Sequence, residues 1–82
     1  MHIFICNLWF TGGRIDQGHH DGVAKRAMDE TVEFDRAISK ALEMTDSKDT
    51  LIAVTADHSH AFTMGGYSGR GNPILGKFNS LT

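Results

Sequence analysis

Histidines and aspartates in this sequence gather into two clusters instead of being scattered along it. The first cluster holds Asp16 and the pair His19-His20, and the second is the Asp-His-Ser-His run of residues 57–60. Asp16 and His20 are four residues apart, so both side chains would lie on one face if a predicted helix began a turn early. A carboxylate and an imidazole on one helix face have a suitable geometry for sharing one cation.

The second cluster follows an apolar segment that we predict to be a strand. Asp57 and His58 are adjacent, and a sharp backbone turn after the strand would let both side chains reach one region or bridge two metal ions. Carboxylate and imidazole ligands without cysteine are more typical of a catalytic zinc than of a structural one. His60 would then be placed to hydrogen-bond a ligating carboxylate and orient it.

Each cluster also has a simpler interpretation. Asp16 or Asp21 could cap the N-terminus of a helix, and the Asp57-His58 pair could form a turn whose polar groups are satisfied locally. Either cluster alone is therefore weak support for a metal site. Two clusters that converge at one sheet edge favour a metal site over separate caps and turns.

Three predicted elements would position these clusters. The apolar run from Ile3 to Phe10 indicates a strand, and Thr50 to Thr55 has the β-branched, almost uniformly apolar composition of a strand covered on both faces. Between them, Asp21 to Met44 shows apolar residues at helical spacing, which predicts a long amphipathic helix. The order strand, helix, strand predicts an α/β fold containing a right-handed βαβ unit.

The predicted βαβ unit brings the two clusters to the same place. Ligands of open α/β sheets bind beyond the carboxyl ends of the strands, and residues 11–20 and 56–60 are the loops that follow the two predicted strands. From Gly65 onward the glycine-rich sequence with Pro73 indicates a loop. We therefore expect Asp16, His20, Asp57, His58 and His60 to point into one shared region.

Composition limits the remaining possibilities. A chain of 82 residues makes at most one small domain with a marginal core. Its single cysteine, Cys6, excludes an internal disulfide framework. The formal charge of −2, with mixed signs, argues against a nucleic-acid partner. No apolar run approaches the roughly 20 residues of a membrane-spanning helix, and residues 3–10 lack the features of a signal peptide.

Two motifs and the stretch after them resemble animal alkaline phosphatases. The run from Gly12 to His20 (Gly-Gly-Arg-Ile-Asp-Gln-Gly-His-His) is similar to a metal-binding segment of that family, and Val54 to His60 (Val-Thr-Ala-Asp-His-Ser-His) to a second one. The run from Gly65 to Asn72 resembles the part that follows. The resemblance covers Gly12 to about Gly76, whereas residues 1–11 resemble the family only as a generic apolar strand.

The resemblance implies a fold and a set of ligands. Residues 1–82 would be a partial alkaline-phosphatase-like domain, a βαβ portion of a sheet sandwiched between helices. Asp16 and His20 match two ligands of a first zinc ion, and Asp57 and His58 match two ligands of a second. His60 matches the histidine that braces the aspartate of the first zinc site.

The resemblance also implies an activity, phosphate-monoester hydrolysis with two zinc ions, a magnesium ion and a serine nucleophile. Thr11 stands where the family has a magnesium-binding glutamate, and no serine here has the Asp-Ser-Ala setting of the nucleophile. The phosphate-binding arginine and the remaining zinc ligands also belong to segments outside this sequence. We therefore expect no catalytic residue within this chain, which supplies only part of the zinc site.

For the complete protein, the resemblance implies a homodimer that acts on phosphate monoesters, secreted or lipid-anchored at the outer cell surface. Two alternatives remain for the function. One is a metal-dependent phosphodiesterase or sulfatase, which would share Asp-His ligands but not the Gly-Gly-Arg-Ile-Asp run. The other is a truncated, non-catalytic remnant that binds zinc weakly.

Overall fold

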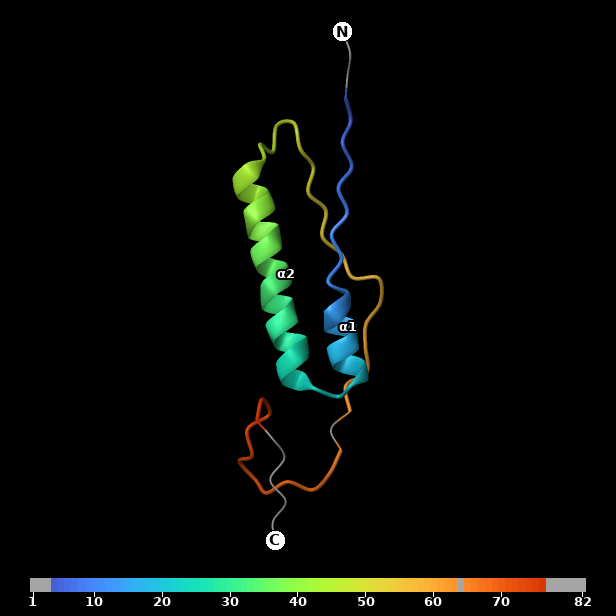
Figure 1. The fold of residues 1–82 in the computed structure, drawn as a ribbon, viewed down its shortest axis with the longest axis vertical. Helices are drawn as coiled ribbons and strands as arrows, with labels where there is room; N and C mark the ends of the chain where they lie inside the picture. The colour runs from blue at the N-terminus through green and yellow to red at the C-terminus, as the bar shows by residue number, and fades with distance from the viewer. Residues whose placement is uncertain (1–3, 64, 77–82) are drawn as a thin grey trace.

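Two helices form the centre of the structure. A computed structural model describes residues 4–63 and 65–76, and its two helices are α1 (Gly13–His20) and α2 (Ala24–Met44). The helices run in opposite directions as a hairpin (Figure 1), and extended or irregular chain precedes and follows them. No helix in the described ranges is long and apolar enough to cross a membrane.

A tight turn at Gly22 reverses the chain between the helices. Gly22 has φ 65°, a left-handed conformation that glycine adopts without a steric penalty. The Gly22 amide donates to the His19 carbonyl at 3.0 Å, and the Val23 amide donates to the Gly18 carbonyl at 2.9 Å. This pair of bonds is a Schellman motif, which satisfies carbonyl groups at the end of α1 and starts α2 two residues later.

The helices meet where two small residues face each other. Gly18 is buried in α1, and Ala24 and Ala27 are buried in α2. A Cβ atom added to Gly18 would lie 2.7 Å from the Ala27 backbone nitrogen, so only glycine permits this approach. Along the rest of α2, half-buried residues such as Phe34 and Ile38 continue the face toward α1 and its flanking segments.

The predicted long helix is confirmed with a later start. The helix ends at Met44 as predicted but begins at Ala24 instead of Asp21. Asp21 belongs to the turn, where it is the C-terminal cap of α1 and pairs with Arg26 of α2. A further helix, α1, occupies most of the segment that was predicted to be a loop.

The predicted α/β fold is wrong for the described part of the chain. Residues 4–10 and 50–55 contain no β-strand, and Ile3 of the first predicted strand lies outside the described residues. Figure 1 shows both segments as extended chain running in the same direction. A strand requires a neighbour that pairs with its amide and carbonyl groups, and neither segment forms such a ladder here. Phe4 and Leu51 are 93% and 91% exposed.

The molecule is elongated and has little core. Its radius of gyration is 18.6 Å, whereas a compact domain of this length would have about 12 Å. Large apolar side chains remain on the surface, including Trp9 at 88% and Met44 at 74% exposure. Burial of apolar area therefore contributes little to the free energy of folding.

We expect the isolated, metal-free chain to unfold without a sharp transition. A helix hairpin with three small buried residues loses too little apolar contact on unfolding to make the process cooperative. Circular dichroism at 222 nm should therefore show a broad, shallow decrease on heating. A steep sigmoidal melt at ordinary protein concentration would contradict this expectation.

The Gly18→Ala substitution should separate the helices. The added methyl group would overlap the backbone of Ala27, and overpacking of this kind costs about 1–3 kcal/mol. The expected result is a lower helical signal at 222 nm and faster hydrogen exchange of the Val23 amide. Gly13→Ala is the matched control, because its added Cβ atom meets nothing within 4 Å and alanine favours helix. Equal losses in the two variants would contradict the packing argument.

Candidate metal centre

Helix α1 brings Asp16 and His20 together. The helix begins at Gly13, so residues four apart lie on one face, as their spacing suggested. The Nε2 atom of His20 lies 3.4 Å from Oδ2 of Asp16. The two side chains are partly exposed, at 67% and 41%, so a cation from solvent can reach the space between them.

The second cluster approaches Asp16 from the other side. Nε2 of His60 lies 3.6 Å from Oδ1 of Asp16, and Nε2 of His58 lies 4.0 Å from the same oxygen. Side chains two residues apart in extended chain point to the same side, which explains why His58 and His60 both face the carboxylate. Three imidazole rings from two distant parts of the sequence therefore surround one aspartate.

His60 is held in place by neighbouring rings. The His19 ring stacks on it with centroids 5.2 Å apart, and the His20 ring meets it edge to face at 4.4 Å. The side chain of His60 is 19% exposed, the least of the three histidines around Asp16. His19, which was left out of the expected ligand set, thus packs against the site, with Phe62 at its edge.

The Asp16 carboxylate has an oxygen suited to a metal ion. Oδ1 is buried from solvent and has no hydrogen-bond partner among the described residues. A buried carboxylate oxygen without a partner is unfavourable unless a donor or a cation compensates it. One donor atom each from Asp16, His20 and His60 lies within 4.8 Å of the other two. Oxygen and imidazole nitrogen donors at this spacing fit zinc.

The charges around His58 also favour a cation. The pKa of His58 is raised above the usual value for histidine. The largest cause is the hydrogen bond from its Nδ1 to the Ser59 carbonyl, and the nearby Asp57 carboxylate is the next. Partial desolvation opposes the shift, and Asp16 adds to it. The ring therefore keeps its proton to a higher pH than an ordinary histidine, as expected beside two carboxylates.

Asp57 lies at the margin of the site. Its Oδ2 is 3.5 Å from Nε2 of His58, but its side chain is 90% exposed. The group of potential ligands in the described residues contains Asp16, His20 and His60, and Asp57 is not part of it. The structure thus brings three of the other four expected residues, His20, His58 and His60, around Asp16 and leaves Asp57 in contact with His58.

An open cavity of about 570 Å³ adjoins these residues. The described residues that line it include Thr11, Asp16, Asp57, His58 and His60. Phe10 and Thr55, at the carboxyl ends of the two predicted strands, also line it. The two clusters therefore gather where the strand ends were expected to meet, although the described residues form no sheet. Thr11, at the expected magnesium position, offers only a neutral hydroxyl group.

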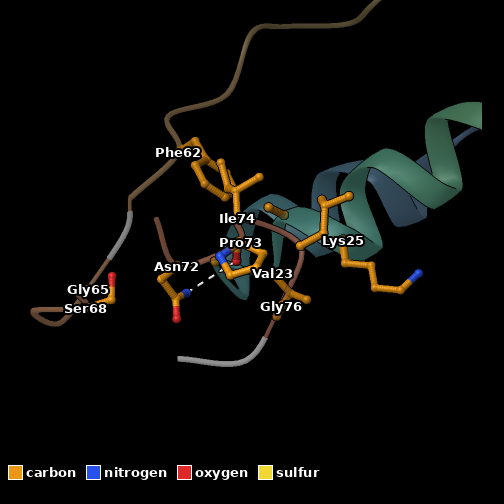
Figure 2. Close-up of a pocket in the computed structure, with 12 residues that line it drawn as sticks. Val23, Lys25, Phe62, Gly65, Ser68, Asn72, Pro73, Ile74 and Gly76 are labelled. Atoms are coloured by element: carbon orange, nitrogen blue, oxygen red, sulfur yellow. Dashed lines mark hydrogen bonds between the residues drawn. The ribbon is translucent and has the colours of Figure 1, made fainter. Parts of the chain in front are cut away.

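A second cavity, of about 340 Å³, lies away from the histidines, between the start of α2 and residues 62–76. Figure 2 shows the apolar side chains of Phe62 and Ile74 close together in its lining. Asn72 also lines it, and its side-chain amide donates a hydrogen bond to the Pro73 carbonyl at 3.3 Å. Lys25 extends away from this space and pairs with Asp29 at 2.5 Å. Among the described residues that line the second cavity there is no carboxylate or imidazole.

Sequence reasoning missed the helix α1. It placed no helix before Asp21, although Gly22 is a recognisable C-terminal stop signal for one. The supporting role given to His60 stays a prediction, and His60 does face Asp16.

The geometry brings carboxylate and imidazole groups close enough that they could hold a metal ion. The sequence model of the alkaline phosphatase family matches residues 7–82. The chain therefore belongs to the alkaline phosphatase family.

Individual relatives agree with this assignment. Tissue-nonspecific alkaline phosphatase of Mus musculus is 66% identical over 65 residues, and that of Homo sapiens is 65% identical. Alkaline phosphatase of Gadus morhua is 62% identical over the same length. These matches cover 79% of this chain but only 12% to 14% of each relative. No solved structure matches the chain significantly.

Proposed function

We propose that this chain supplies part of the zinc centre of an enzyme that hydrolyses phosphate monoesters. The observation that carries the proposal is the Asp16 carboxylate, which is surrounded by Nε2 atoms of His20, His58 and His60 within 4.0 Å. Membership of the alkaline phosphatase family supports the same function.

In this proposal each side chain has a defined task. Asp16 and His20 hold one zinc ion, and Asp57 and His58 hold a second. Zinc, when bound, supplies a Lewis acid that stabilises charge on attacking and leaving oxygens. The hydrogen bond from Nδ1 of His58 to the Ser59 carbonyl at 2.9 Å leaves the Nε2 lone pair of the neutral ring available to a metal.

The remaining machinery belongs to parts of the family that this chain does not contain. The proposal assigns the nucleophilic serine, the phosphate-binding arginine and the other zinc ligands to those parts. A magnesium ion is the least supported cofactor, because Thr11 replaces the glutamate expected from the resemblance. For the complete protein we propose a homodimer, secreted or lipid-anchored at the outer cell surface. The phosphodiesterase and sulfatase alternative is disfavoured, because the relatives named above are all alkaline phosphatases.

The 82-residue chain alone should not hydrolyse phosphate esters at a useful rate. Positioning and electrostatic stabilisation supply most of the catalysis in phosphoryl transfer, and this chain holds neither a nucleophile nor a phosphate-binding arginine. The measurement is hydrolysis of p-nitrophenyl phosphate at alkaline pH with added zinc and magnesium. The chain and its Asp57→Ala, His58→Ala double variant should both remain at background. Turnover by the chain that the double variant lacks would contradict this expectation.

A chimera tests the proposed function itself. Residues 7–82 should replace the matching segment of mouse tissue-nonspecific alkaline phosphatase, and the chimera should hydrolyse p-nitrophenyl phosphate. The same double substitution should lower kcat/KM by more than about a hundredfold, because even loss of a ligand's hydrogen-bond partner costs up to that much. Lys48→Ala, in the exposed turn after α2, is the matched control and should retain activity. A folded, zinc-loaded chimera without activity would disprove the proposal.

A further inference from the structure

His19 has no expected ligand role, yet its ring contacts two other rings. It stacks on His60, with centroids 5.2 Å apart and ring planes 17° from parallel, and it meets Phe62 edge to face at 5.9 Å. Stacked and edge-to-face pairs at such separations are the arrangements that aromatic rings favour. His19 is also half-buried, whereas Gln17 and His20 of the same helix are exposed.

The course of residues 60–62 explains why two rings reach His19. Side chains two residues apart in extended chain point to the same side, so His60 and Phe62 both face α1. Phe62 is half-buried and lines the second cavity, where its side chain lies near Ile74 (Figure 2). The Phe62 ring therefore has packing of its own and can anchor the His19 ring.

The position of the His60 ring matters for the carboxylate beside it. Nε2 of His60 lies 3.6 Å from Oδ1 of Asp16, slightly beyond the range of a normal hydrogen bond, and the family resemblance implies that His60 braces this carboxylate. A ring that moved farther away would lose that role. His19 does not belong to the group of possible metal donors in the described residues, so packing against His60 is the contribution that its contacts define.

We propose that His19 is a positioning residue of the metal centre, whose ring, anchored by Phe62, holds the His60 ring beside the Asp16 carboxylate. This inference rests on the proposed zinc-binding function and leaves its ligands unchanged. A side chain that orients a ligating carboxylate changes metal affinity without touching the ion, and His19 acts one contact farther out. Loss of one aromatic pair changes an equilibrium about two- to tenfold.

The first test measures the zinc affinity of the full 82-residue chain by competition with a chromophoric chelator. His19→Ala should weaken binding about two- to tenfold, whereas His19→Phe, which keeps an aromatic ring, should stay within about twofold of the parent. Alanine has a higher helix propensity than histidine, so the loss would not come from a weakened α1. Gln17→Ala, at an exposed position of the same helix, is the matched control and should bind zinc as the parent does.

A double-mutant cycle tests whether His19 acts through His60. In the His60→Ala background, His19→Ala should cause no further loss of zinc affinity, because the ring that His19 positions is absent. A residue that only stabilised the helix would cause the same loss in both backgrounds. The metal-free chain gives a separate readout, since the stacked rings should show a nuclear Overhauser effect between the ring protons of His19 and His60.

Four results would overturn the inference. They are parent-like zinc affinity in His19→Ala, equal losses in His19→Ala and His19→Phe, full additivity with His60→Ala, and absence of the nuclear Overhauser effect. A parent chain that binds no zinc would overturn it as well. The proposed function is judged separately, by the activity of the chimera.

Discussion

The close approach of Gly18 to Ala27 is the contact on which the rest of this structure depends. The described residues bury little else, so the hairpin is held by two backbones that meet where a Cβ atom would lie 2.7 Å from a neighbouring nitrogen. The Schellman turn at Gly22 directs α2 back along α1. The Gly18–Ala27 contact and the Gly22 turn together hold α1 against α2, and Asp16 and His20 lie side by side on one face of α1.

The Asp16 carboxylate on α1 lowers the stability of the fold instead of adding to it. A buried carboxylate oxygen without a hydrogen bond lowers stability, and Oδ1 of Asp16 lies 3.6 Å from Nε2 of His60 and 4.0 Å from Nε2 of His58. A divalent cation bound at this oxygen would compensate it. Residues 58–60 contact Asp16, His19 and His20 of α1. A metal ion bound between these two segments would add to the free energy of folding.

Much of the site could be predicted from sequence, and less of the fold. The spacing of Asp16 and His20 and the apolar period of residues 24–44 depend only on helix geometry, so both predictions agree with the structure. The helix α1 was missed because glycines at positions 12, 13 and 18 have low helix propensity. Packing of Gly18 against α2 outweighs this low propensity.

The predicted strands were wrong because a strand is not a local structure. Residues 4–10 and 50–55 have strand composition but no pairing partner among the described residues.

The sequence by itself determined which chemical groups are present, their order, and the family to which they belong. Carboxylates and imidazoles at these spacings, within the Gly-Gly-Arg-Ile-Asp and Asp-His-Ser-His runs, indicate zinc without any coordinates. Only the tertiary structure decided which groups meet. Nε2 of His60 lies 3.6 Å from Oδ1 of Asp16, while its Nδ1 faces the Ala61 carbonyl. Such a choice depends on the path of the backbone after residue 57 and on α1 beside it, and residue types alone do not contain that information.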